Sequence, residues 1–248
     1  MVFSSPDWVS DITWEIPDSV PLGQFTLNGL DANFQRDSTK PLVVDGITGK
    51  SYSRDDIQQR VEWLAAGLAR ELGWSVNEGS PWDKVVAIYS LNTVSSDPAF
   101  PRKFSVFLLM PRQIDFFTLS WAIHRLNGIC LLIHPTSSVA EIVSHMQSAK
   151  CSTLFTCQTL VSTSVGVAAE LSIPLNRLFV LPLPEGFLKN AEPIDHLRGL
   201  EQLVSEGSRL PPLEPLVWTK GQAKEQVAYL CATSGTSGKQ VRLTLCEG

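Results

Sequence analysis

Short apolar segments alternate with helical patterns along most of the chain, and this alternation constrains the fold more than any other feature. Val85–Tyr89 is a continuous apolar run of the kind that forms a strand buried on both faces. Similar runs occupy residues 129–133, 153–156 and 178–181. Because parallel strands need a long crossover, usually a helix, the alternation predicts βαβ units. We therefore expect an α/β fold with a mainly parallel sheet.

Helical patterns fill the intervals between the predicted strands. Apolar residues recur at spacings of three and four over residues 57–72, with Ser53 as the expected N-cap and Gly73 as the stop. Ser138 and Glu141 stand three residues apart, which predicts a capping box for a helix that ends near residue 148. Further helices are expected over residues 116–127, 160–171 and 196–206.

The beginning of the chain follows a different pattern. Residues 1–40 are rich in Pro, Asp, Ser and Trp and have weak periodicity, so we expect an extended arm that packs Trp8 and Trp14 against the rest. The pattern sharpens at residue 41, and a hairpin of two short strands around a Gly-containing turn is expected over residues 42–52. Residues 182–226 contain several prolines and are expected to cross the surface toward the last strand.

Composition and charge narrow the classes of function. The 248 residues are 44% hydrophobic and 18% charged, so the chain can bury a sizeable core as one large or two small domains. A net charge of −5 argues against a nucleic-acid partner and against an anionic membrane surface. Five cysteines without a C-x-x-C pair indicate a reducing compartment, and there is no zinc pattern. Without a secretory signal or an apolar run of roughly 18 residues, we expect a cytoplasmic protein, with a peroxisomal address open for a longer form.

A glycine- and hydroxyl-rich segment near the end of the chain carries the clearest functional pattern. It directly follows the apolar run 227–230, which predicts a buried strand. Glycines let the backbone approach a ligand, consecutive N–H groups form a concave anion site, and hydroxyls and an ammonium group add donors. We therefore predict a phosphate-binding segment, called the phosphate loop below, formed by Thr233, Ser234, Gly235, Thr236, Ser237, Gly238 and Lys239.

Two other interpretations of the phosphate loop compete with this one. The motif of P-loop ATPases, G-x-x-x-x-G-K-[ST], fails because Thr233 stands where its first glycine is needed and Gln240 stands where it places a magnesium-binding hydroxyl. A flexible Gly/Ser-rich linker is the other alternative, but such linkers rarely follow a buried strand in this order.

The stretch from Tyr229 to Gln240 resembles the S-G-T-[ST]-G loop of the adenylate-forming (AMP-binding) enzymes, in the branch of the fungal acyl-CoA synthetases and 4-coumarate–CoA ligases. Segments 45–52, 64–68 and 121–128 are similar to the N-terminal half of such an enzyme, and they occur in the same order and spacing. The resemblance implies that residues 41–240 are a partial adenylation domain, that is, an incomplete N-terminal part of the family's large domain.

The same resemblance implies a reaction in two steps. A full-length enzyme of this family joins a small carboxylic acid to ATP, releases pyrophosphate, and transfers the acyl group to a thiol, usually coenzyme A. It therefore uses ATP, Mg²⁺ and coenzyme A, with the phosphate loop closing over the β- and γ-phosphates. Val241 occupies the position of the family's own lysine, so Lys239 is either a phosphate contact or a solvated lysine.

The groups that complete the reaction in the family are expected beyond residue 248. They are the adenine pocket, the magnesium-binding acid, the ribose-binding aspartate and the catalytic lysine, so we predict no catalytic residue and no metal ligand in this chain. We expect the fragment to be inactive and to bind no cofactor tightly. His124 is predicted to be a hydrogen-bonded packing residue and His134 a structural residue after a strand. Solvated surface charge is expected at Asp55, Asp56, Glu62 and Glu71.

Two segments depart from the family pattern. Residues 94–113 lack helical or strand periodicity, and joining the residues on either side restores the family spacing. A Val-Ser pair can be encoded GTAAGT and Gln can be encoded CAG, which are usual intron edges, so we predict that residues 94–113 are a translated intron. Val241 with Arg242 can likewise be encoded GTACGT, so residues 241–248 are predicted to be a non-native tail. The alternative is a genuine insertion together with a genuine truncation.

Two classes of function follow from these patterns. The first is an N-terminal fragment of an ATP-dependent acyl- or aryl-CoA ligase. The second is a non-catalytic nucleotide-binding remnant or interaction module, and an adenylation domain of a peptide synthetase is a third alternative. The sequence leaves open the acid substrate, the acceptor (coenzyme A or a carrier protein) and the oligomeric state.

Overall fold

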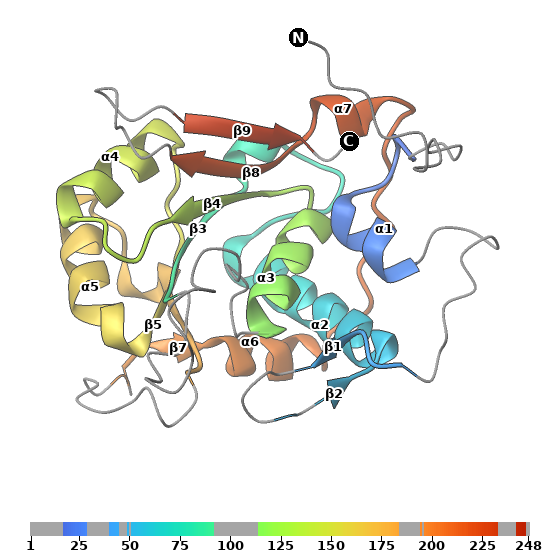
Figure 1. Ribbon diagram of the computed structural model, residues 1–248, viewed down its shortest axis with the longest axis horizontal. Helices are drawn as coiled ribbons and strands as arrows, with labels where there is room; N and C mark the ends of the chain where they lie inside the picture. Colours follow the sequence, from blue (N-terminus) through green and yellow to red (C-terminus); the bar gives the residue numbers. More distant parts are fainter. Residues whose placement is uncertain are drawn as a thin grey trace, which may run out of the picture.

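The described residues form a seven-stranded sheet covered by helices on both faces (Figure 1). A computed structural model describes residues 17–28, 40–44, 49, 51–91, 114–183, 194, 196–232 and 242–246. The strands lie in the order β7-β6-β5-β3-β4-β8-β9. Neighbouring strands are parallel except for β8 and β9, which are antiparallel. The predicted α/β fold with a mainly parallel sheet is confirmed.

The strands follow the apolar runs of the sequence closely. Their bounds are β3 (Val85–Tyr89), β4 (Ile129–Ile133), β5 (Leu154–Cys157), β6 (Leu178–Leu181), β7 (Arg198–Gly199), β8 (Val227–Ala232) and β9 (Arg242–Cys246). The helices are α1 (Leu22–Asn28), α2 (Arg54–Leu72), α3 (Ile114–Arg125), α4 (Val139–Ser148), α5 (Val161–Glu170), α6 (Leu200–Gly207) and α7 (Gln222–Glu225). Helices α1 and α7 and strands β7 and β9 were not predicted from the sequence.

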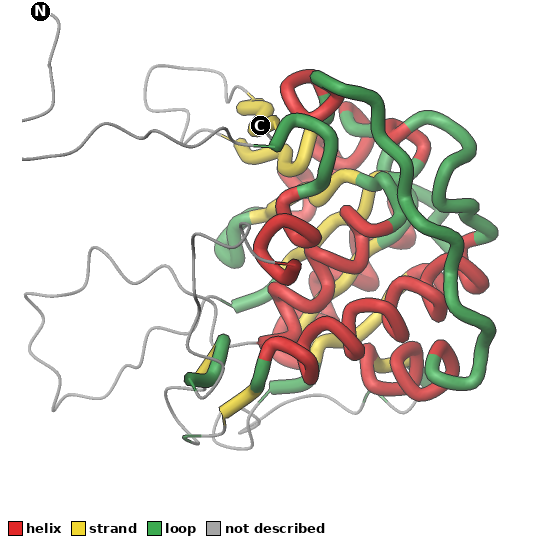
Figure 2. The backbone as a smooth tube through the Cα atoms, turned by 90° about the vertical axis from the view of Figure 1, so that its right-hand side faces the viewer, coloured by secondary structure: helices red, strands yellow, loops and turns green. Residues whose placement is uncertain are grey.

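Two helix layers enclose the sheet (Figures 1 and 2). Helices α2, α3 and α6 cover one face, and α4 and α5 cover the other. Along β4, Ile129, Leu131 and Ile133 pack with the α4/α5 layer, whereas Cys130 and Leu132 pack with the α2/α3/α6 layer. Successive side chains of a strand point to opposite faces, and both faces are buried here, so the strands are continuous apolar runs in the sequence.

Capping residues lie at the ends of helices α2 and α4 where the sequence predicts them. The backbone N–H of Asp56 donates to Ser53 Oγ (3.1 Å), and the Asp56 carboxylate accepts from the backbone N–H of Ser53 (2.9 Å). Asp56 is exposed, as predicted, but it is also a capping residue, a role that the prediction of a solvated charge did not include. Gly73 ends α2 with φ of 68°, a conformation that suits glycine. Ser138 and Glu141 form the predicted capping box of α4.

Helices α2 and α6 cross at very short range because each contributes a glycine to the contact. A Cβ at Gly67 would lie 2.3 Å from the carbonyl oxygen of Leu203, and a Cβ at Gly207 would lie 1.8 Å from that of Trp63. Both neighbours are backbone atoms, which cannot move aside as the end of a side chain can. The two glycines therefore set the distance between these helices.

Two more of the carboxylates that were predicted to be solvated are paired with arginines. Glu62 accepts from Arg125 Nε (2.9 Å), which joins α2 to α3. Glu71 pairs with Arg198, just before α6. The prediction missed both pairs because it considered α2 alone, whereas α3 and β7 bring cations to it. Asp55 is exposed, as predicted.

A buried lysine ties the same layer to the amino edge of the sheet. Lys84 precedes β3 and is 3% exposed. Its Nζ donates to the carbonyl oxygen of Leu126 at the end of α3 (3.1 Å) and to those of Ser75 and Val76 after α2. Burial lowers the pKa of Lys84, and two nearby carboxylates oppose the shift.

The N-terminal arm is not extended throughout, because part of it forms α1, which packs against α3. The predicted hairpin is present as antiparallel β1 (Val43–Val44) and β2 (Ser51–Tyr52). Trp8, Trp14 and the predicted insert 94–113 lie outside the described residues. Among the residues that are described, every helix is too short or too polar to cross a lipid bilayer.

Candidate functional site

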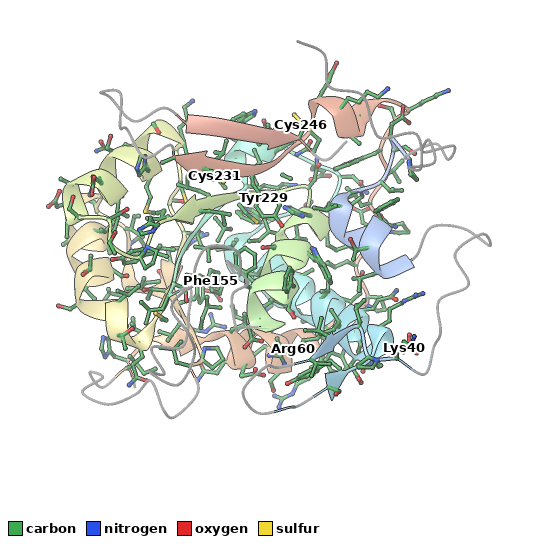
Figure 3. The ribbon with its side chains drawn as sticks, viewed as in Figure 1. Lys40, Arg60, Phe155, Tyr229, Cys231 and Cys246 are labelled. Atoms are coloured by element: carbon green, nitrogen blue, oxygen red, sulfur yellow. The ribbon has the colours of Figure 1, made fainter. Side chains whose placement is uncertain are left out.

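The carboxyl ends of three neighbouring strands lie level with one another at one edge of the sheet. Tyr89 at the end of β3 pairs with Ile133 at the end of β4, and Leu132 of β4 pairs with Cys231 of β8. Strand β8 therefore ends beside β4, and Figure 3 labels Cys231 near this end. In open α/β sheets, ligands bind outside the carboxyl ends of the strands.

The same edge contains a point where the direction of winding reverses. The chain leaves β3 through α3 on one face and goes to β4, whereas it leaves β5 through α5 on the other face and goes to β6. Because β3 and β5 are neighbours, the two connections diverge from adjacent strand ends. Such a switch point is the usual ligand-binding position of a doubly wound sheet.

The phosphate loop belongs to this edge by its connectivity. All of its residues, 233–239, lie outside the described residues, so the structure places only the strands on either side. Ala232, the last residue before the loop, pairs with Arg242, the first residue of β9. The chain therefore leaves and re-enters the sheet at the carboxyl end of β8. The phosphate contacts of the individual loop residues stay a prediction.

The turn between β4 and α4 forms the neighbouring part of the edge. His134 is exposed, and its Nδ1 accepts a hydrogen bond from the backbone N–H of Thr136 (3.3 Å). This local contact agrees with the structural role predicted for His134. Tyr89 Oη donates to the carbonyl oxygen of Pro135 (3.1 Å) and braces the turn against β3. Burial raises the pKa of Tyr89, so its hydroxyl keeps the hydrogen that it donates.

The bracing role of Tyr89 was not predicted from the sequence. The available signal was a single polar-tipped aromatic residue at the end of an otherwise aliphatic strand. A buried tyrosine hydroxyl usually finds a hydrogen-bond partner, so this position could have been marked as a contact point.

The amino end of α4 points to this edge as well, because α4 follows β4. A helix N-terminus attracts anions, but here the helix provides its own. The Glu141 carboxylate accepts from the backbone N–H of Ser138 (2.7 Å) and from its hydroxyl (2.8 Å), and these bonds lower the pKa of Glu141. The N-terminus of α4 is therefore already occupied by a carboxylate of its own helix.

A buried histidine lies under the strand that leads into the phosphate loop. His124 on α3 is 0% exposed, and its Nε2 lies 3.2 Å from the carbonyl oxygen of Ala228 in β8. Because a carbonyl oxygen only accepts, Nε2 carries the hydrogen and donates it. Burial lowers the pKa of His124 to about 4, so the ring is neutral at physiological pH. This geometry agrees with the predicted packing role.

Other positions in the described part of the chain do not add to the site. No three His, Cys, Asp or Glu side chains there are grouped so that they could hold a metal ion. A hollow of about 630 Å³, lined by Trp82 and Lys220 among others, lies at the amino edge of the sheet, where Ile129 and Val227 begin β4 and β8. It is at the opposite end of β8 from the phosphate loop.

Comparison with curated proteins gives long matches to two fungal proteins. The chain is 52% identical over 240 residues to the acyl-CoA ligase easD of Emericella nidulans, which covers 97% of this chain and 39% of that protein. It is 49% identical over 243 residues to the acyl-CoA ligase cm3C of Cordyceps militaris, which covers 97% of this chain and 36% of that protein. The chain thus spans less than two fifths of the length of these relatives. No protein-family model matches it.

Solved structures share the fold at low sequence identity. The anthranilate CoA ligase AuaEII, solved in complex with anthranoyl-AMP, superposes with a TM-score of 0.61 at 12% identity and covers 94% of this chain and 36% of that one. A red-emitting luciferase from Phrixothrix hirtus gives a TM-score of 0.60 at 16% identity, covering 94% and 37%. Both likenesses concern the fold alone.

Proposed function

The chain belongs to the adenylate-forming enzymes, in the branch of the fungal acyl-CoA ligases, and from this premise we propose that it is the N-terminal part of an ATP-dependent carboxylic acid–CoA ligase. Such an enzyme activates an acid as its acyl-adenylate and transfers the acyl group to coenzyme A. The observation that carries the proposal is the similarity to easD and cm3C over 97% of the chain. The position of the phosphate loop after β8 supports it.

The phosphate loop is the part of this chain that we assign to ATP. Its backbone N–H groups and its hydroxyls at Ser234, Thr236 and Ser237 would donate to phosphate oxygens and stabilise the negative charge of the departing pyrophosphate. ATP, when bound, would supply the adenylyl group that is joined to the acid, with pyrophosphate as the leaving group. Lys239 would add a charge-assisted bond if it points to the phosphates, since Val241 cannot.

We propose that the 248-residue chain does not complete this reaction by itself. The groups that would bind adenine, ribose and Mg²⁺, and the catalytic lysine, belong in this proposal to the part of the relatives that the chain does not cover.

The substrate class is a small carboxylic acid, fatty or aromatic. We also propose a cytoplasmic location, or a peroxisomal one for a longer form, which fluorescence of a tagged complete gene product tests.

ATP–pyrophosphate exchange with a panel of fatty and aromatic acids tests the function. We expect the product of the complete transcript to exchange with at least one acid and the 248-residue chain with none. Exchange by the 248-residue chain would contradict its proposed incompleteness. A complete product that binds ATP without exchange for any acid would instead indicate a nucleotide-binding remnant.

Loop variants of the complete product show whether the assigned residues act. Thr236→Ala removes a proposed phosphate donor and should lower exchange about a hundredfold. Ser205→Ala removes an exposed hydroxyl on α6 and serves as the matched control, with unchanged exchange expected. Equal exchange rates in the two variants would remove the phosphate loop from the mechanism.

Residues 94–113 are proposed to be a translated intron. Strand β3 ends at Tyr89 and α3 begins at Ile114, and connections of this kind usually have about 2–6 residues. Removing 94–113 leaves residues 90–93, which is a connection of that length. Sequencing of the transcript decides: a dominant message that retains the segment would contradict the proposal.

Residues 241–248 are proposed to come from a second unspliced intron. Arg242–Cys246 form β9 and pair with β8, a strand that was not predicted for a non-native tail and that favours the alternative of a genuine segment. A message that continues differently after Gln240 would support the proposal. Retention of the codons for 241–248 in the main transcript would contradict it.

A further inference from the structure

Strand β8 differs from its neighbours in how its side chains are shared between the two helix layers. Side chains of β3, β4 and β6 alternate strictly between the layers. On β8, Val227 and Leu230 both pack with the α4/α5 layer although they are three residues apart, and Tyr229 packs with the α2/α3/α6 layer. An uninterrupted strand would place residues three apart on opposite faces. The alternation of β8 is therefore broken between Val227 and Tyr229.

The break coincides with a shift in the pairing of β8 and β9. Val227 pairs with Cys246 and Tyr229 pairs with Leu245, so β8 advances by two residues where β9 advances by one. This is the pattern of a β-bulge, with Ala228 as the additional residue. The bulge turns Tyr229 toward α3. It also determines to which face of the sheet each later side chain of β8 points, up to the start of the phosphate loop.

His124 contacts the bulge from α3. A bulge takes its additional residue out of the ladder, and a buried carbonyl group then needs another donor. Ala228 is 1% exposed, and its carbonyl oxygen accepts from His124 Nε2 at 3.2 Å. The His124 ring also lies edge-on to Tyr229, labelled in Figure 3, with ring centroids 5.0 Å apart. One side chain thus contacts both the bulged residue and the residue after it.

We propose that His124 is a positioning residue, which fixes the β8 bulge and thereby the direction in which β8 enters the phosphate loop. An apolar side chain could fill the same volume but would leave the Ala228 carbonyl without this donor. Glutamine could place an N–H group near the position of Nε2. The broken alternation of β8 and the two contacts of His124 do not involve residues 241–248, so the role of His124 stands on them even if those residues are intron-derived. The importance of His124 for ATP rests on the proposed function.

Hydrogen–deuterium exchange of the 248-residue chain tests the positioning role directly. We expect His124→Leu to speed amide exchange in residues 227–239 about tenfold and His124→Gln to stay within about twofold of the wild type. Leu64→Ala is the matched control, because it opens a cavity in the same core from α2 and removes no hydrogen bond. Equal acceleration in residues 227–239 by His124→Leu and Leu64→Ala would show a packing effect only and would overturn the proposal.

Nitrogen-15 NMR of the imidazoles gives a readout that does not require any variant to fold. The chain has 4 histidines, so His124 can be assigned individually. We expect its neutral ring to carry the hydrogen on Nε2. A hydrogen on Nδ1 would mean that His124 donates nothing to the Ala228 carbonyl, and the proposal would fail.

Kinetics of the complete gene product separate this inference from the proposed function. If that product catalyses exchange, His124→Leu should raise the KM for ATP about tenfold, and His124→Gln and Leu64→Ala should leave it unchanged. An unchanged KM in His124→Leu would overturn the link to the phosphate loop. If the wild-type product shows no exchange, the proposed function fails, and the hydrogen-exchange and NMR results still decide the role of His124.

Discussion

The two helix layers that cover the sheet are built in different ways. The α4/α5 layer packs mainly aliphatic side chains against the strands. The α2/α3/α6 layer adds backbone contacts at Gly67 and Gly207 and pairs between arginines and the carboxylates of α2 and α6. It also buries the ionisable groups of Lys84 and His124, whereas the α4/α5 layer buries the neutral hydroxyl pair Ser164–Thr156. The layer that contacts the β8 bulge is thus the one with the more directional contacts.

This difference predicts which of the two layers tolerates amino-acid substitutions better. Aliphatic burial is non-directional, so neighbouring side chains can adjust to a small alteration. A backbone contact or a buried hydrogen bond fails when one partner is altered, because the remaining group cannot find a substitute. We therefore expect substitutions of similar size to cost more in the α2/α3/α6 layer than in the α4/α5 layer.

The largest contrast is expected between two Gly→Ala substitutions. Gly207→Ala forces a Cβ to 1.8 Å from the Trp63 carbonyl oxygen and should cost about 3 kcal/mol or more of unfolding free energy. Gly166→Ala in α5 places its Cβ 3.7 Å from Val139, an ordinary contact, and should stabilise by about 0.5–1 kcal/mol through helix propensity. Urea unfolding measures both. Similar values would show that the layers do not differ in this way.

The next effect is a loss of stability in acid that comes from His124. Its pKa is about 4 in the fold and 6.5 in the unfolded chain, so between these values the unfolded state binds more protons. Stability is therefore complete above pH 6.5 and falls as the pH drops toward 4, by about 3 kcal/mol in all. Urea unfolding of the wild type and of His124→Gln over this range checks it. Parallel pH profiles of the two proteins would refute the assignment.

Lys84 should give a smaller but clear effect. Lys84→Met leaves three backbone carbonyls without their donor and should cost about 2 kcal/mol. The burial of the ammonium group, which lowers its pKa, offsets part of that loss. Lys150→Met, at an exposed position after α4, is the control and should change stability by less than about 0.5 kcal/mol. Thermal unfolding that shows no difference would mean that the carbonyls find other donors.

The smallest effect should be the same in both layers. Ser53→Ala and Ser138→Ala each remove the N-cap of a helix that has a capping box, α2 in one layer and α4 in the other. Each should cost about 1 kcal/mol, because a cap acts within its own first turn. A much larger cost for Ser53→Ala in chemical unfolding would extend the stricter requirements of its layer to the helix ends.

Local patterns in the sequence predicted most of the elements and their limits. The N-cap Ser53, the stop at Gly73 and the capping box at Ser138 are each set by residues within four positions, and the structure has them where they were predicted. The apolar run Val85–Tyr89 is the predicted strand without change. The phosphate loop was also read from consecutive residues, although only the strands on either side of it are described.

Contacts between distant segments could not be read in this way. Glu62 and Glu71 have the spacing of solvated helix charges, and only the packing of α2 with its neighbours brings Arg125 and Arg198 to them. Helix α1 was missed because seven residues in a weakly periodic arm form a helix only when α3 supports them.

The sequence by itself thus determined the α/β class, the capped ends of α2 and α4 and the resemblance to the family, because periodicity, caps and a consecutive motif depend on neighbours along the chain. The tertiary structure alone decided the crossing of α2 and α6, the pairing of their charges and the β8 bulge. Val227 to Leu230 read as a plain buried strand, and nothing local marks Ala228 as an additional residue. The bulge exists where β8 meets β9 and His124, and His124 lies 104 positions away from Ala228 in the chain.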